Sequence, residues 1–326
     1  MSIVLYTPIY HASPGTQSRV NLIRKSLEIT GHKTILIIGR EFQLQKAYHA
    51  LGDKLLTREI IWKAIGKLIS KSIIKQKPKK VILFIDISAS AIPYLKKHNI
   101  KTILSIEDLT PEYKNYNLKA SKKFYQVFTR YVEQADAIIT PSHTLSERLK
   151  HIGIKAITVP IGLEPYISIE EALARPQPST ILHAGQINTQ RQIKILLNLA
   201  NKYKLLVHNF GKLADKLNHP NIKKYRKPMP EKAVDIAKQA HLGLILEFRK
   251  AYTLSRLYFH TSLLQPIISE GYGSWLEEAT YLGIKLYSLK AIEKIVNNYE
   301  QYVNEYIKIQ KELSIPHVHR PLLDLL

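Results

Sequence analysis

Short apolar runs alternate with helix-like segments along this chain, and the pattern is clearest between His241 and Ser288. The strand-like run 242–247 is followed by a polar loop, by a helix-like segment at 255–264 and by an apolar run that ends at Ile268. Such alternation predicts an α/β fold with a parallel sheet and right-handed crossovers. Ligands of these sheets bind beyond the carboxyl ends of the strands, so we expect chemistry in the loops after Glu247 and Ile268.

The same alternation divides the chain into two lobes. In the first lobe, apolar runs rich in β-branched residues predict strands at 3–8, 34–39, 81–85, 102–106, 137–140 and 156–160. In the second lobe they predict strands at 180–184, 204–208, 222–225, 242–247, 266–268 and 285–287. Helices are predicted between them, including 16–30, 118–134, 190–202, 230–239, 255–264, 275–282 and 289–312. Because 164–179 contains three prolines, we expect a linker there, between domains 1–163 and 180–312.

The composition fits two domains and excludes some chemistry. A length of 326 residues with 45% hydrophobic residues allows two cores of ordinary size. The sequence has no apolar run of about eighteen residues and no charged-then-apolar leader, so we expect a cytoplasmic protein. Cysteine is absent, which excludes disulfides, thiolate metal sites and a cysteine nucleophile.

The formal net charge of +22 implies an anionic partner. Nucleotide diphosphates, an anionic membrane surface and nucleic acid all fit, and charge alone does not rank them. The alternative is that the excess lysines are spread over solvated helix faces, such as the segment 63–80.

Four sequence motifs, in order along the chain, carry a resemblance to a known family. They are Pro14-Gly-Thr-Gln-Ser-Arg19, Ile106-Glu-Asp-Leu109, His183-Ala-Gly-Gln-Ile187 and the run SRLYFHTSLLQPII at 255–268. The last run resembles the nucleotide-binding signature of GT-B nucleotide-sugar transferases, in which a basic residue opens a helix that precedes an apolar strand. Within these enzymes, the chain is similar to the bacterial galactofuranosyl- and glucosyltransferase-like group.

The resemblance implies a GT-B architecture, which consists of two Rossmann-like, doubly wound parallel-sheet domains facing a central cleft. The N-terminal domain, 1–163, would bind the acceptor, and the C-terminal domain, 180–312, would bind the nucleotide sugar. The tail, 313–326, would cross back to the N-terminal domain, as the terminal helix does in GT-B proteins.

The resemblance also implies which residues bind the donor. Arg256 takes the place of the family's basic residue, and helix N-termini and guanidinium groups stabilise a diphosphate without a metal. Arg191 stands where the family has a lysine, Gln186 replaces the family's arginine, and Gly185 allows close backbone approach. Each arginine could instead be a surface residue. The remaining donor candidates implied by the resemblance are Gly15, Thr16, Arg19, Glu247 and Tyr258, although the first three also suit an ordinary helix-entry turn.

Glu270 and Glu278 support a second, conflicting alignment of the same region. With seven residues between them, they resemble the two-glutamate motif of retaining GT-B enzymes, in which the second carboxylate binds the ribose hydroxyls. In that alignment, Gly271 and its neighbours would contact the transferred sugar. We favour the first alignment, because it leaves an intact strand directly before Glu270.

A catalytic base is expected after the predicted strand 102–106. Glu107 or Asp108 follows that strand, where a carboxylate can accept the proton of the acceptor hydroxyl. The family often has His-Asp here, so Glu107 stands in place of a histidine, and a helix-capping role is the alternative. His11, after the first strand, is another candidate base.

The sequence and the resemblance together predict a metal-independent transfer of a hexose from a nucleotide diphosphate sugar, in particular a UDP-sugar. The acceptor would be a hydroxyl of a glycan, a lipid-linked molecule or a protein, with peripheral contact to the inner membrane face. No cofactor is expected, and no metal site, because His317 and His319 have the pattern of surface residues. The alternative is a non-catalytic protein of the same fold that binds nucleic acid or an anionic membrane.

Overall fold

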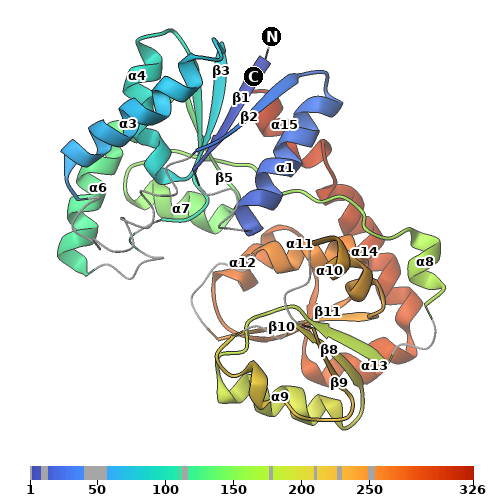
Figure 1. Cartoon of the computed structure of the whole chain (residues 1–326). Helices are drawn as coiled ribbons and strands as arrows, with labels where there is room; N and C mark the ends of the chain where they lie inside the picture. Colours follow the sequence, from blue (N-terminus) through green and yellow to red (C-terminus); the bar gives the residue numbers. More distant parts are fainter. Residues whose placement is uncertain are drawn as a thin grey trace. The chain divides into compact units, whose positions relative to one another are not determined.

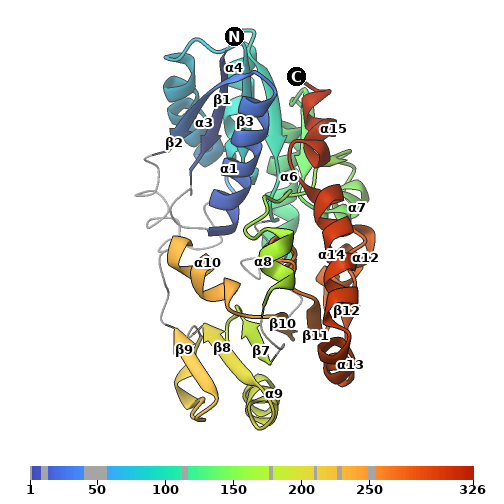
Figure 2. The same cartoon turned by 90° about the vertical axis from the view of Figure 1, so that its right-hand side faces the viewer.

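The computed structural model describes residues 2–8, 14–39, 57–109, 111, 117–175, 179–208, 211–225, 230–248 and 254–326. The chain forms two compact units (Figures 1 and 2). The first combines Met1–Gly162 with Ile315–Leu326, and the second is Leu163–Ser314. Within the described residues, no helix has both the length and the apolar character needed to cross a membrane.

The first unit is built on a six-stranded sheet in the order β2-β1-β3-β4-β5-β6, and all neighbouring strands are parallel. The strands are β1 (Ser2–Thr7), β2 (Lys33–Ile38), β3 (Lys80–Phe84), β4 (Lys101–Ser105), β5 (Ala137–Thr140) and β6 (Ile157–Thr158). The chain adds β2 on one side of β1 and then crosses to add β3 on the other. This reversal makes the carboxyl ends of β1 and β3 the topological switch point, where such sheets bind ligands.

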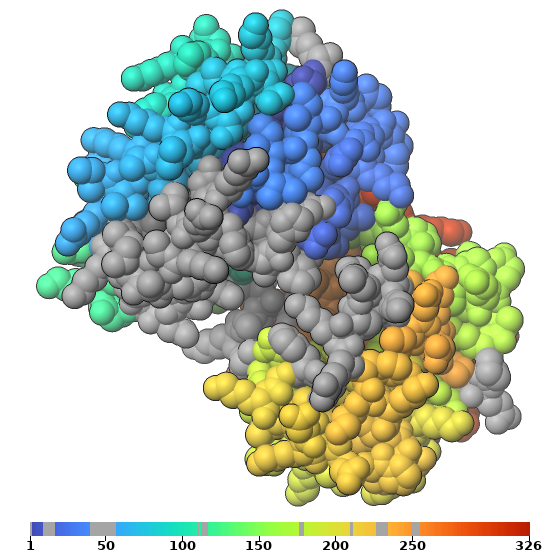
Figure 3. Space-filling model, viewed as in Figure 1, coloured from blue at the N-terminus to red at the C-terminus, as the bar shows by residue number. Residues whose placement is uncertain are grey.

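Helices cover both faces of the first sheet (Figure 1). They are α1 (Pro14–Ile29), α3 (Glu59–Ile74), α4 (Ile92–Lys96), α6 (Leu118–Val132), α7 (His143–His151) and α15 (Arg320–Leu323), with a 3₁₀ turn at Asp86–Ala91. Val4 and Tyr6 of β1 pack toward α3, α4, α6 and α7, whereas Ile3 and Leu5 pack toward α1 and α15. Burial on both faces explains why the strands are continuous apolar runs. The outward side of α3 forms part of the surface in Figure 3 (light blue).

The end of the chain belongs to the first unit. Leu322 of α15 is fully buried in the core that also contains residues of α1. The His319 ring is fully buried and forms a 2.9 Å hydrogen bond with the Ile161 carbonyl. The expectation that His319 is a surface residue is therefore wrong, because the returning segment packs onto Gly162, which has a φ of 78° and no room for a side chain. Burial lowers the pKa of His319 to about 4, so its imidazole is neutral.

The second unit repeats the architecture, with parallel strands in the order β12-β11-β10-β7-β8-β9. The strands are β7 (Thr180–His183), β8 (Lys204–His208), β9 (Ile222–Tyr225), β10 (Leu242–Glu247), β11 (Ile267–Gly271) and β12 (Leu286–Tyr287). The helices are α8 (Ile169–Leu173), α9 (Gln190–Ala200), α10 (Pro230–Lys238), α11 (Leu254–Ser262), α12 (Ser274–Tyr281), α13 (Ile292–Asn297) and α14 (Tyr299–Leu313). Here the strand order reverses between β7 and β10, so the switch point lies at their carboxyl ends.

Three segments differ from the sequence-based expectations. The expected linker contains helix α8, which begins with a capping box between Ser168 and Glu171, and it belongs to the second unit. Strand β11 continues to Gly271 because its backbone pairs with β10 as far as Glu247. The helix expected over 289–312 is divided into α13 and α14, since Asn298 leaves the helical conformation with φ −129° and ψ 36°.

Candidate functional site

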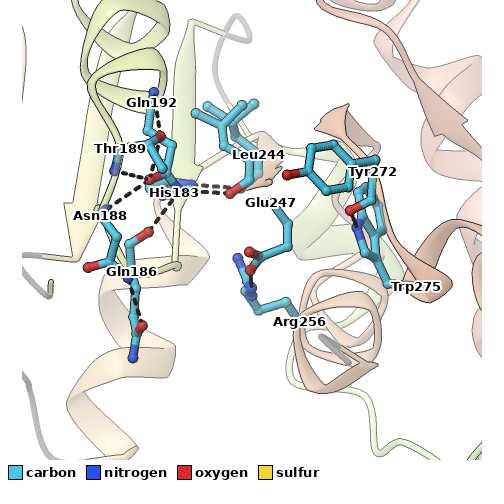
Figure 4. A network of polar contacts seen from close by, with 11 residues as sticks. His183, Gln186, Asn188, Thr189, Gln192, Leu244, Glu247, Arg256, Tyr272 and Trp275 are labelled. Carbon is cyan, nitrogen blue, oxygen red and sulfur yellow. Dashed lines mark hydrogen bonds and ion pairs between the residues drawn. The ribbon is translucent and has the colours of Figure 1, made fainter. Parts of the chain in front are cut away.

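An ion pair lies at the carboxyl edge of the second sheet, at the switch point between β7 and β10 (Figure 4). Arg256, in the first turn of α11, places Nη2 2.6 Å from Oε2 of Glu247, the last residue of β10. The side chains of Arg256 and Glu247 are only 12% and 3% exposed. This pairing fixes the guanidinium beside the strand ends, where the sequence motif predicts a donor-binding arginine.

His183, the last residue of β7, lies next to this pair. Its Nδ1 is 3.1 Å from the Leu244 carbonyl, which can only accept, so Nδ1 donates and Nε2 keeps its lone pair. Burial lowers the pKa of His183 to about 3, and the nearby Arg256 charge acts in the same direction. His183 is therefore a neutral imidazole, and its buried Nε2 makes no hydrogen bond within the described structure.

Gly185 leaves space beside the ion pair. A Cβ at this position would lie 2.5 Å from Nη1 of Arg256 and 2.9 Å from Cε1 of His183. Any larger residue would displace the guanidinium or the imidazole. The glycine therefore allows the backbone after β7 to pass close to Arg256, as the sequence predicted for a strand end near a ligand.

Gln192, which the sequence reasoning missed, holds the turn between β7 and α9. Its amide nitrogen donates to the carbonyls of Gln186 and Leu246, both at 2.9 Å, and its Oε1 accepts from the Asn188 backbone at 2.8 Å. With Thr189 it forms a capping box at the start of α9. The pattern Thr189-x-x-Gln192 is the sequence signal that could have revealed it. Through these bonds, the N-terminus of α9 is fixed to the end of β10.

Arg191, in the first turn of α9, lies on the exposed rim of the same edge. Its Nη2 is 2.6 Å from Oε1 of Glu270 on β11, and its guanidinium carbon is 4.7 Å from the centre of the Phe248 ring. The Arg191 side chain is 64% exposed, so a ligand can reach it. Phe248 in turn meets Tyr272 edge to face at 6.4 Å, and Tyr272 is 55% exposed.

The two glutamates of the alternative alignment have different surroundings. Glu270 is partly exposed and lies inside β11, whereas Glu278 is fully buried in α12. Gly271 has a φ of 140°, and a Cβ there would overlap the Glu247 backbone. Tyr258, another donor candidate, is buried in α11 at 4% exposure. The structure therefore brings Glu247, Arg256, Gly185, Gln186, Arg191, Glu270 and Gly271 to one sheet edge, and it places Tyr258 and Glu278 inside the unit.

A second arginine–glutamate pair lies in the first unit. Arg19 of α1 is fully buried, with Nε 2.9 Å from Oε1 of Glu107 and Nη1 donating to the Val159 carbonyl at 2.8 Å. The Ser105 hydroxyl donates to the same Glu107 oxygen at 2.7 Å. Arg19 thus holds Glu107 at the end of β4, and Asp108 follows as an exposed residue.

The remaining candidates of the first unit are less informative. His11 lies outside the described residues. Gly15 and Thr16 lie in the first turn of α1, and the side chain of Thr16 lies outside the described part of the chain.

Comparison with known proteins identifies the fold. Residues 21–163 match the family model described as "Glucosyltransferase 3-like, N-terminal domain". The structure is similar to sucrose-phosphate synthase from Thermosynechococcus elongatus, with a TM-score of 0.68, 12% identity, and coverage of 100% of this chain and 98% of that chain. It is similar to Anabaena HepE in complex with UDP, with a TM-score of 0.68, 9% identity and 99% coverage of both chains. The fold is GT-B.

Another protein of similar fold is described as an epimerase. The structure of a putative UDP-N-acetylglucosamine 2-epimerase from Listeria monocytogenes matches with a TM-score of 0.62, 10% identity, and coverage of 99% of this chain and 94% of that chain. No curated protein matches the sequence. The expected GT-B resemblance and α/β fold class are confirmed, and the family model supports a glycosyltransferase. The narrower galactofuranosyl-type group stays a prediction.

We expect the buried Arg256–Glu247 pair of the candidate site to contribute to the free energy of unfolding. Arg256→Met should lower the free energy of unfolding by about 3 kcal/mol, because the buried Glu247 carboxylate loses its guanidinium partner. The double variant with Glu247→Gln should be more stable than Arg256→Met alone, because it also removes the buried negative charge. Urea unfolding followed by circular dichroism measures both.

The control is Lys202→Met, which breaks the exposed Lys202–Glu293 pair and should leave the unfolding midpoint nearly unchanged. If Arg256→Met and the double variant lose the same stability, the two side chains are not energetically coupled.

Proposed function

We propose that this chain is a glycosyltransferase that moves a hexose from a UDP-sugar to a hydroxyl group. The observation that carries the proposal is the Arg256–Glu247 pair beside Gly185 at the switch point of the second sheet. A fixed guanidinium next to open backbone suits a diphosphate group. Support also comes from the similar fold of Anabaena HepE, whose structures are in complex with UDP and with UDP-glucose.

In this proposal, the second unit stabilises the leaving diphosphate. Arg256 supplies a fixed cation, and the first turn of α9 adds backbone N–H groups and the Arg191 guanidinium. His183 stays neutral and offers Nε2 as an acceptor, which can orient a ligand hydroxyl without adding charge. Glu247 keeps the guanidinium aimed at the strand ends.

The first unit would supply the base for an acceptor hydroxyl of a glycan, a lipid-linked molecule or a protein. Oε1 of Glu107 is already bound by Arg19 and Ser105. We propose that the neighbouring Asp108, which is exposed to solvent, accepts the proton, while Glu107 fixes the loop after β4.

We expect the positive charge of Arg191, at the start of α9, to increase the affinity for UDP. Arg191→Gln is expected to weaken UDP binding roughly tenfold, because it removes a charged hydrogen-bond donor worth about 1.5 kcal/mol. Isothermal titration with UDP measures the affinity. Lys194→Gln is the matched control, since Lys194 is exposed one turn later on α9 and carries the same charge.

Lys194→Gln should bind UDP like the unmodified chain. An equal loss in both variants would mean that only the overall charge matters. If UDP does not bind the unmodified chain while duplex DNA does, the non-catalytic alternative replaces the transferase proposal.

We expect turnover to persist in EDTA. In the proposed site, Arg256, Arg191 and the N-terminus of α9 neutralise the diphosphate, which leaves no step that requires a divalent ion. A screen of UDP-sugars for hydrolysis or transfer, with and without EDTA, measures this. Complete loss of turnover in EDTA that manganese restores would contradict the proposed role of these residues.

The two carboxylates after β4 can be separated by their variants. Asp108→Asn should lower kcat on the order of a hundredfold and leave UDP affinity unchanged, because it removes the proposed base. Glu107→Gln, which can still accept a hydrogen bond from Arg19, should have a smaller effect on kcat. The proposed roles are reversed if Glu107→Gln is the more damaging change.

A further inference from the structure

The outward face of α3 carries a row of exposed lysines. Lys63, Lys67 and Lys71 of α3, and Lys75 at its C-cap, follow one another at four-residue spacing, and all four are exposed. Like charges at this spacing destabilise a helix by about 0.2–0.5 kcal/mol per pair, so the row has a cost for folding. Glu59, at the edge of the row, pairs with Lys63 and Arg130 at 3.1 Å each. The three later lysines form no ion pair among the described residues.

The first unit as a whole concentrates the positive charge. It contains 27 lysines and arginines but only 12 aspartates and glutamates, which accounts for +15 of the net charge of +22. The α3 row therefore lies on the more basic part of the chain, and nearby positive charge reinforces its attraction for anions.

Apolar side chains interrupt the lysine row on the same face. Ile60 is 71% exposed and Leu68 is 51% exposed, so neither is buried with Trp62 and Ile69 of the same helix. Trp62 is fully buried and stacks on Tyr131, with the ring centres 5.2 Å apart. The first turn of α6 shows the same combination, with Leu118 88% exposed beside exposed lysines.

We propose that the outward face of α3 binds the surface of an anionic membrane. The lysines would contact lipid phosphates, and Ile60 and Leu68 would enter the boundary between headgroups and acyl chains. Nucleic acid would satisfy the lysines equally well, but its phosphate backbone offers no apolar layer for Ile60 and Leu68. Exposed apolar residues at helical spacing among lysines therefore favour a membrane. This face belongs to the first unit, whereas the proposed donor site belongs to the second.

Co-sedimentation of the full chain with vesicles tests this proposal. Vesicles of phosphatidylcholine alone are compared with vesicles that also contain phosphatidylglycerol, at low and at high salt. The chain should bind the anionic vesicles at low salt and release them at high salt. The triple variant Lys67→Gln, Lys71→Gln and Lys75→Gln should lose affinity on the order of a hundredfold.

The matched control removes the same charge elsewhere. Lys290→Gln, Lys294→Gln and Lys311→Gln replace exposed lysines of the second unit and should leave vesicle binding unchanged. Ile60→Ser with Leu68→Ser should weaken binding to anionic vesicles while leaving binding to duplex DNA unaltered.

Three results would overturn the proposal. The first is that equal amounts of the chain sediment with neutral and with anionic vesicles. The second is that both lysine triple variants lose the same vesicle affinity. The third is that duplex DNA displaces the chain from vesicles while the Ile60 and Leu68 changes have no effect on vesicle binding. The last result would identify nucleic acid as the partner of this face.

Discussion

The candidate site depends on a buried charge pair. Glu247 is nearly inaccessible to solvent, and a buried carboxylate is costly unless a cation and hydrogen bonds compensate it. Arg256 supplies that cation from the start of the following helix, so strand β10 and helix α11 hold each other in register at the sheet edge. The pair also constrains its neighbours. Burial lowers the pKa of His183, and the nearby Arg256 charge acts in the same direction, so the imidazole is neutral. Residue 185 must lack a side chain, because a Cβ there would meet the Arg256 guanidinium.

The first unit contains a similar arginine–glutamate pair. Arg19 of α1 reaches Glu107 at the end of β4, as Arg256 of α11 reaches Glu247 at the end of β10. In each unit, an arginine from a helix fixes a glutamate at the carboxyl edge of a parallel sheet. The two pairs differ in access, because Arg19 is fully buried whereas Arg256 retains some exposure. Solvent therefore does not reach the Arg19 side chain, whereas part of the Arg256 side chain stays accessible.

Much of the fold could be predicted because the strands are buried on both faces. The run 81–85 is apolar throughout and the run 242–247 is apolar up to its last residue, Glu247, which distinguishes both from the amphipathic helices between them. The end of β11 was less predictable, since Ser269, Glu270 and Gly271 join the strand through backbone pairing that side-chain patterns do not record. The break at Asn298 is also weakly encoded, because apolar spacing continues on both sides of it.

The positions of candidate site residues that belong to sequence motifs could be predicted. Their contacts with residues distant in the sequence could not. The positions of Arg256 and Gly185 at strand and helix ends follow from the alternation of elements. That Arg19 turns toward Glu107 depends on an approach between residues 88 apart in the sequence. Gln192 was missed because its bonds to Gln186 and Leu246 exist only once α9 lies against β10. Sequence patterns locate residues along elements, and tertiary packing selects their partners.

The return of the chain to the first unit affects the order in which the protein can fold during synthesis. Domains generally fold as units as they leave the ribosome, starting from the N-terminus. Here Leu322 completes a core that begins with Ile3, and residues 163–314 must be translated between them. The second unit is contiguous, so all of its residues are synthesised before the segment 315–326 that completes the first core. The first unit to be made is therefore the last to acquire its complete core.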